Sequence, residues 1–191
     1  MAEPAGPPSG PFSFCLEVSM RLDSDDFELF GLPRRYAVDP HVLDERRRAL
    51  QAEVHPDRHA SGDAAARRVS MQWAVRVNEA HSRLKDPLRR ATYLCELFGN
   101  SVRPEDNTAM PAEFLVKQMA WREALDEAPD REAVELLRRK LTVEREDAYL
   151  RLAQAIDEAH DYTGAAAQTR ALMFTERLAA DVDDRLLALE A

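Results

Sequence analysis

The sequence predicts an all-α protein, and three observations support this prediction. Glycine is scarce, with 6 among 191 residues, whereas alanine, leucine, glutamate and arginine are abundant. No stretch alternates convincingly between apolar and polar residues with period two. Apolar residues instead recur at helical spacing along most of the chain. We therefore expect amphipathic helices around an apolar core, which a hydrophobic fraction of 45% allows.

The N-terminal half reads as four helices separated by clear breaks. Gly31 marks the end of the first helix, and Pro56 ends the second, because proline disfavours helical geometry in the residue before it. The loop Ser61-Gly62-Asp63 caps the third helix, and Gly99-Asn100 closes the fourth. The first, second and fourth expected helices cover about residues 25–30, 41–54 and 88–98. The third runs from just after Asp63 to about residue 85. The expected core positions are Leu43, Leu50, Val54, Val69, Trp73, Val77, Ala80 and Leu84.

The C-terminal half reads as three longer helices after a polar linker with two prolines, at 101–111. Their expected ranges are 112–128, 131–162 and 165–189. Short connections between amphipathic helices predict an antiparallel bundle. The second helix of this bundle carries the stripe Val134, Leu137, Leu141, Ala148, Leu152, Ile156 and Ala159, and the third carries Leu178, Val182, Leu186 and Leu189.

Composition and charge exclude several classes of protein. A formal net charge of −9 argues against nucleic-acid binding, which requires an excess of Lys and Arg. No apolar run is long enough to span a bilayer, so no membrane partner is expected. Cys15 and Cys95 lie in unlike contexts, and neither has a second cysteine at metal-ligand spacing. This use of cysteine favours a protein of the reducing cytoplasm. Residues 1–23 resemble neither a secretory signal nor a mitochondrial presequence; we expect a disordered extension, with Met20 as an alternative start.

The tripeptide His55-Pro56-Asp57 stands between the second and third expected helices. Pro56 fixes the backbone of this connection, and Asp57 presents a carboxylate that a partner arginine can bind bidentately. His55 adds a hydrogen-bonding ring. The cluster Arg46-Arg47-Arg48 on the preceding helix offers positive charge to an acidic partner. These residue types predict a protein-binding hairpin tip.

Two other interpretations of the tripeptide compete with this one. In the first interpretation, the triplet is only a turn that breaks the helix. In the second, His55 and His59 are metal ligands, but Pro56 breaks the helix that would bring them onto one face, and no third ligand motif is evident. No nucleophile motif appears either. We therefore expect no cofactor, no metal and no enzymatic activity.

The order of the motifs resembles a J-domain, the module with which co-chaperones stimulate DnaK-like chaperones. His55-Pro56-Asp57 is followed by Asn78-Glu79-Ala80, Asp86-Pro87 and Tyr93. The opening DDFELFGLPRRY and the later FLVKQMAWREALDE narrow the resemblance to the HscB family of iron–sulfur cluster assembly. This implies an N-terminal J-domain hairpin and a C-terminal three-helix bundle in an L-shaped arrangement of two domains. The corresponding boundaries are an extension 1–23, a J-domain with connecting helix 24–98, a linker 99–110 and a bundle 111–191.

The resemblance also implies the first partner, the DnaK-like chaperone HscA. Docking of the tripeptide would trigger ATP hydrolysis on that chaperone, so this chain itself need not be an enzyme. The implied chaperone-binding residues are His55, Pro56, Asp57, Arg46, Arg47, Arg48 and Arg58.

The helix expected at 112–128 has apolar residues on two faces. Phe114, Trp121, Ala124 and Leu125 form an ordinary core stripe, whereas Leu115, Val116 and Met119 fall on the other side. A bundle helix needs one buried face, so the second is covered either by another element of this chain or by a partner. Resemblance to HscB implies a partner, the cluster scaffold IscU. The implied scaffold-binding residues are Leu115, Val116, Met119, Ala120, Glu123 and Phe174.

The chain departs from the family pattern at four positions. Arg47 stands where J-domains usually have a core residue, Glu53 where a basic residue is common, and His81 where an aromatic is usual. Ala120 replaces a familiar carboxylate on the scaffold-binding face. An alternative function is a general J-protein whose bundle binds another client.

Overall fold

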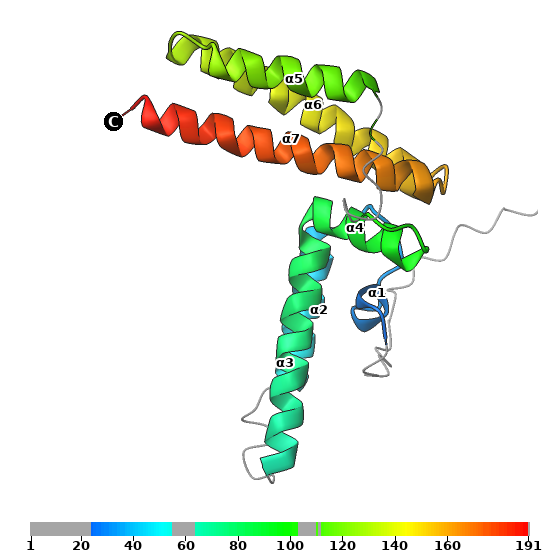
Figure 1. Cartoon of the computed structure of the whole chain (residues 1–191). Coiled ribbons are helices and arrows are strands. Elements are labelled where there is room, and N and C mark those ends of the chain that lie inside the picture. Colours follow the sequence, from blue (N-terminus) through cyan, green and yellow to red (C-terminus); the bar gives the residue numbers. More distant parts are fainter. Residues whose placement is uncertain (1–23, 55–63, 103–109, 111, 191) are drawn as a thin grey trace, which may run out of the picture.

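A computed structural model describes residues 24–54, 64–102, 110 and 112–190 (Figure 1). Every regular element within these residues is an α-helix, which confirms the all-α prediction. The expected extension 1–23 lies outside this part of the chain. The helices are α1 (Asp26–Leu29), α2 (Pro40–Glu53), α3 (Ala64–Lys85), α4 (Pro87–Leu97), α5 (Ala112–Asp126), α6 (Arg131–Asp157) and α7 (Tyr162–Ala188).

The helices form two arms, which give the molecule the outline of the letter L, as expected (Figure 1). The hairpin arm consists of α2 and α3, which pack against each other along their length. The bundle arm consists of α5, α6 and α7, with α6 antiparallel to the other two. Helix α4 lies against α7 at the corner where the arms meet.

Aspartate side chains cap the N-termini of most of the described helices. In each case a carboxylate oxygen accepts a hydrogen bond from a backbone N–H of the first turn, which satisfies a group that has no partner within the helix. Asp25 starts the four-residue α1 through a capping box with Glu28. The other capping residues are Asp39 for α2, Asp86 for α4, Asp130 for α6 and Asp161 for α7.

The turn between α6 and α7 falls earlier than the sequence predicted. Helix α6 ends at Asp157 instead of Tyr162, and α7 begins at Tyr162 instead of Ala165. His160 has a φ of 52°, in the left-handed region that interrupts a helix. Asp161 then caps α7 by accepting a hydrogen bond from the Gly164 N–H at 2.8 Å. The expected core positions Val69, Ala159 and Leu189 are exposed, and the last two lie beyond the ends of α6 and α7.

One hydrophobic core continues from the hairpin arm into the bundle arm. Buried residues of α1 to α4, such as Phe27 and Leu94, belong to the same cluster as Leu152, Ile156 and Leu172 of α6 and α7. The far half of the bundle holds a second, smaller cluster: Val134, Leu137, Leu141, Leu178, Val182 and Leu186. The shared core resists hinge motion between the arms, because separating them would expose buried apolar surface.

Polar contacts reinforce the junction of the arms. The backbone N–H groups of Tyr36 and Ala37 donate to the two carboxylate oxygens of Asp157, at 2.6 and 2.8 Å. The Phe98 ring stacks on Tyr162, with 4.0 Å between ring centroids. Burial raises the pKa of the Tyr36 hydroxyl to about 12, so this ring stays neutral at the junction.

A buried ionic cluster fastens the short α1 to the hairpin arm. Asp26 is fully buried, and its carboxylate lies 2.5 Å from Arg76 and 2.6 Å from Arg83, both on α3. Its backbone N–H donates to the Tyr93 hydroxyl at 2.9 Å. A four-residue helix is too short to be stable by itself, so these contacts explain how α1 keeps its place.

Candidate functional site

The structure holds the two ends of the predicted hairpin tip. His55, Pro56, Asp57 and Arg58 themselves lie outside the described residues. On one side of them, Val54 is buried and its N–H donates to the Leu50 carbonyl at 3.0 Å. Across the hairpin, the Gln51 side chain donates to the Asn78 side chain at 2.8 Å. This contact lies near the end of α2 but well inside α3, which begins at Ala64, so the first turns of α3 lie beyond it.

The three arginines expected to bind the chaperone have different surroundings. Arg46 turns towards the hairpin's own base, where its guanidinium donates to the carbonyls of Phe30 and Gly31 at 2.6 and 2.8 Å. Arg47 is half-buried, and its Nε has no hydrogen-bond partner among the described residues. Arg48 is exposed and donates weakly to the Asp44 carbonyl at 3.3 Å. The basic surface is thus narrower than the sequence suggested.

His81 joins the two helices of the hairpin arm, a contact that the sequence analysis missed. It is buried beside Phe30, and its Nε2 lies 2.6 Å from the Asp44 carboxylate on α2. This hydrogen bond, aided by Lys85, holds the pKa of Asp44 below its usual value. The signal was present, since His81 follows Val77 by four residues on the core stripe. A buried imidazole with a carboxylate partner thus replaces the usual aromatic.

The second candidate surface is the outer face of α5, formed by Leu115, Val116, Met119, Ala120 and Glu123. All five side chains are exposed, with 44% of Leu115, 68% of Val116 and 71% of Met119 accessible to solvent. No other helix covers this face within the described part of the chain. The wheel-based prediction of a second apolar face on this helix is therefore confirmed.

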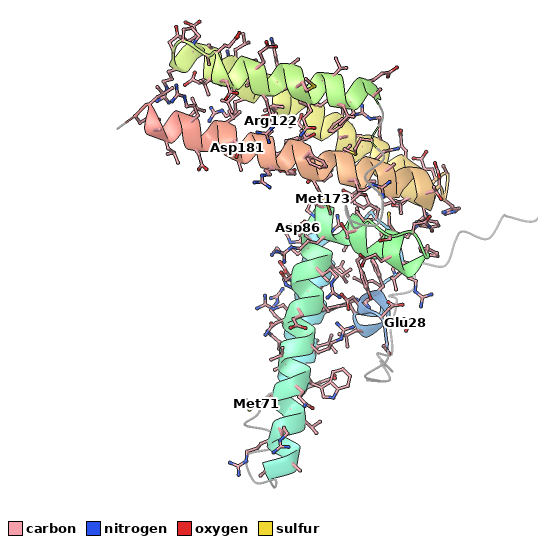
Figure 2. All side chains as sticks on the ribbon, viewed as in Figure 1. Glu28, Met71, Asp86, Arg122, Met173 and Asp181 are labelled. Atoms are coloured by element: carbon pink, nitrogen blue, oxygen red, sulfur yellow. The ribbon has the colours of Figure 1, made fainter. Side chains whose placement is uncertain are left out.

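Phe174 of α7 lies at the same height along the bundle axis as Leu115 of α5. Arg122 of α5 pairs with Asp181 of α7 at 3.7 Å (Figure 2). The two helices run in the same direction, and Leu115 and Phe174 each precede that pair by two helical turns. Phe174 is 36% exposed. It therefore extends the α5 outer face across to α7.

Helix α5 is only partly embedded in the bundle, and two expectations about it need correction. None of its residues is fully buried. Ala124, expected in the core stripe, is exposed, and Trp121 is half-buried against the smaller core cluster. The Lys117 ammonium lies 5.0 Å from the Trp121 ring centroid and 2.5 Å from the Glu144 carboxylate of α6. The ion pair with Glu144 and the apolar packing of Trp121 thus hold α5 on the bundle, whereas the cation–π contact lies within α5.

Two further findings concern the described residues. They contain no group of three or more His, Cys, Asp or Glu side chains that could hold a metal ion. His55 and His59, which the metal hypothesis invoked, lie outside this part of the chain. None of the described helices is long and apolar enough to cross a membrane.

Comparison with known proteins identifies the class. Residues 110–183 match the family model described as the HSCB C-terminal oligomerisation domain. A co-chaperone protein HscB homolog from Bordetella petrii is 48% identical over 159 residues, covering 83% of this chain and 94% of the relative. A homolog of the same name from Azoarcus sp. (strain BH72) is 45% identical over 176 residues, covering 91% and 99%. The two arms are those of a J-domain co-chaperone.

Solved structures agree with this assignment. The chaperone HscB from Vibrio cholerae has a TM-score of 0.72 at 32% identity, over 84% of this chain and 96% of that one. The human co-chaperone HscB has a TM-score of 0.82 at 24% identity, over 97% and 96%, and shows that the fold is shared. The chain belongs to the HscB family of co-chaperones.

Proposed function

We propose that this chain stimulates the ATPase of the DnaK-like chaperone HscA and delivers the iron–sulfur scaffold IscU to it during cluster maturation. The J-domain, 24–98, contacts the chaperone, and the bundle, 111–191, holds the scaffold. The observation that carries the proposal is the exposed apolar α5 outer face. It lies on one arm, while the hairpin that bears His55-Pro56-Asp57 forms the other.

The α5 outer face has the chemistry of a protein-binding surface. Leu115, Val116 and Met119 present contiguous apolar surface, which a helix at the surface of a small bundle keeps only at a cost in solubility. Phe174 supplies an aromatic edge, and Glu123 supplies a charge at the rim. A central apolar cluster with a polar rim is the usual anatomy of an interface. IscU is the occupant that family membership favours.

The roles proposed for the hairpin arm follow from its residue types. Asp57 accepts hydrogen bonds from a chaperone arginine, His55 adds a polar contact, and Pro56 restricts the backbone. Arg48 and the exposed part of Arg47, together with Arg58, supply positive charge to an acidic chaperone surface. Arg46 positions the base of the hairpin, since its guanidinium already donates to two carbonyls there.

The shared core gives the two contacts a mechanical relation. Because apolar residues of both arms belong to one cluster, a scaffold held on the bundle keeps a fixed orientation to helices α2 and α3 of the hairpin arm. Binding both partners would therefore bring the scaffold to the chaperone at little additional cost in orientational freedom. ATP hydrolysis takes place on the chaperone, consistent with relatives that are named co-chaperones. Because these relatives are bacterial, we place the process in the bacterial cytoplasm.

A binding experiment separates this proposal from a general J-protein with another client. Purified IscU and an unrelated unfolded client would be titrated separately into the full chain. The proposal predicts saturable binding of IscU that the double variant Leu115→Ala/Met119→Ala weakens. Binding of the unfolded client alone, with none of IscU, would favour the general J-protein.

A further inference from the structure

Helix α3 has an exposed apolar face in the half that is distant from the bundle arm (Figure 2). Met71 and Val75 are 62% and 56% exposed, and no other described helix covers them. At 100° per residue they lie opposite the buried positions Ala80 and Leu84. With their polar neighbours they line an open hollow of about 890 Å³. We call this wall the α3 outer face: Arg67, Arg68, Met71, Gln72, Val75 and Arg76.

The described chain begins at the edge of this face. The Arg76 guanidinium donates to the Ser24 carbonyl at 3.1 Å and lies 2.5 Å from the Asp26 carboxylate. Val69, which is 51% exposed, precedes Arg76 by seven residues and therefore lies on the same edge of α3. The residues before Ser24 thus join the described chain beside exposed apolar side chains.

The sequence just before Ser24 is rich in large apolar residues. The first eleven residues of the chain contain four prolines, whereas six of the next eleven are large and apolar. Removing such side chains from water is favourable, and the α3 outer face offers apolar surface close to where they are attached. Residues 12–22, which lie outside the described residues, are called the N-terminal segment. Its apolar members are Phe12, Phe14, Leu16, Val18, Met20 and Leu22.

We propose that the N-terminal segment binds along the α3 outer face of the same chain, with its apolar side chains against Met71 and Val75. From Arg76 to Ala64, which lines the far end of the hollow, α3 rises about 18 Å. Eleven residues in an extended conformation span up to about 36 Å. The segment is therefore long enough to cross the edge at Arg76 and to cover the face up to the first residue of α3.

The charges of the segment and of the face match in order. Arg21, close to the point of attachment, meets Glu79, which lines the hollow one turn after Arg76. Glu17, farther from that point, meets Arg67 and Arg68 towards the start of α3. Glu79 and the two arginines are exposed, and no ion pair within the described residues involves them. The segment is thus complementary to the face when it runs from Arg76 towards Ala64.

Covalent attachment favours the chain's own segment over any other occupant of the face. A short tether gives the attached group an effective concentration that is roughly millimolar. A separate protein at lower concentration would have to bind the face much more tightly to displace the segment.

Binding of the segment would stabilise the start of α3. The hydrogen bond between Gln51 and Asn78 joins the hairpin helices well inside α3, so the first turns of α3 lie beyond it. A segment on the α3 outer face would cover these turns on the side opposite to α2 and slow their local opening. The inference concerns a contact within one chain and does not depend on the proposed function.

Hydrogen exchange of the full chain tests the binding. Backbone amides of residues 64–72 should exchange about tenfold more slowly in the wild-type chain than in Phe14→Ser/Leu16→Ser, which lacks two of the apolar side chains that bind α3. Pro7→Ser/Pro8→Ser is the matched control, because it changes only residues before the segment, and it should behave as wild type. The protection should not depend on protein concentration. Equal exchange in the wild-type chain and in Phe14→Ser/Leu16→Ser would overturn the proposal, and so would protection that grows with concentration, which would assign the face to a second copy.

A disulfide trap tests the place of binding. Cys15 lies in the segment, and the other native cysteine, Cys95, is buried. Arg68→Cys and Lys85→Cys each add an exposed thiol to α3, eight residues before and nine residues after Arg76, so an unbound segment reaches both. A bound segment holds Cys15 near position 68 only, and the Arg68→Cys chain should therefore form its intrachain disulfide about tenfold faster than the Lys85→Cys chain. Equal rates, or a faster reaction of Lys85→Cys, would contradict binding at the α3 outer face.

Discussion

The double variant Leu115→Ala/Met119→Ala should lose scaffold binding and keep its fold. Truncating a fully buried leucine or methionine to alanine costs about 2–5 kcal/mol of stability. Here 44% of Leu115 and 71% of Met119 are already exposed, so most of the removed surface is already in contact with water. We expect a combined loss of only about 1 kcal/mol in the free energy of unfolding.

The effect on binding should be larger, because the same side chains would be fully buried against the scaffold. Interface anchors typically cost 2 kcal/mol or more when truncated, and neighbouring values do not add fully. A combined loss of about 2–4 kcal/mol corresponds to roughly a 30- to 700-fold weaker dissociation constant. Isothermal titration with purified IscU measures this loss, and thermal unfolding followed by circular dichroism measures stability. Leu187→Ala removes an apolar side chain elsewhere whose exposure, 64%, lies between those of Leu115 and Met119, and it should change neither quantity.

Trp121→Ala, unlike the double variant, should mainly lower the stability of the bundle. Truncating a fully buried aromatic residue to alanine costs about 3–5 kcal/mol of stability. Since Trp121 is half-buried, we now expect a loss of roughly 1.5–3 kcal/mol in stability. If the Leu115/Met119 double variant melts early and binds IscU normally, those residues stabilise the bundle, and the reasoning about the α5 outer face is refuted.

Three further predictions concern the framework. Asp26→Asn should lower the free energy of unfolding in urea by about 2–4 kcal/mol, since it removes a fully buried charge from two partly hydrated arginines. The pKa of Asp44 is held low mainly by its hydrogen bond to His81, so the stability from this contact should be full above about pH 4 and should fall as pH drops through the lowered pKa; Asp44→Asn should flatten that acid limb. Burial raises the pKa of the Cys95 thiol to about 11, so in a Cys15→Ser chain alkylation should proceed only on unfolding, and rapid labelling of the native chain would contradict this packing.

The helices were predictable because their signals are local. Pro and Asp punctuation located the starts of α2 and α4 to within a residue, and the 3.6-residue period located Leu43, Leu50 and Val77 in the core. The α6–α7 turn was missed by several residues, because it depends on the left-handed backbone of His160, which no sequence pattern required. Helical periodicity shows which residues share a face but not how far the neighbouring helix extends. Val69 and Ala124 therefore appeared to be core residues and are exposed.

The candidate surfaces were predictable to different degrees. The exposed face of α5 followed from the helical wheel, because a narrow bundle cannot bury both sides of one helix. The surroundings of Arg46 did not, since its carbonyl partners Phe30 and Gly31 lie in the turn after α1, and no helical period relates that turn to α2. The Asp26 cluster with Arg76 and Arg83 was missed for the same reason. Long-range polar contacts leave no periodic trace in a single sequence.

The ATP turnover of HscA, measured with this chain and IscU separately and together, tests the central claim most directly. We expect stimulation by the chain alone and a further, more than additive increase when both proteins are present. Asp57→Asn should abolish both effects with helicity unchanged. The Leu115→Ala/Met119→Ala variant should keep the first effect and lose the second. Stimulation near the wild-type level by Asp57→Asn, or a full combined effect with the double variant, would contradict the two-arm account.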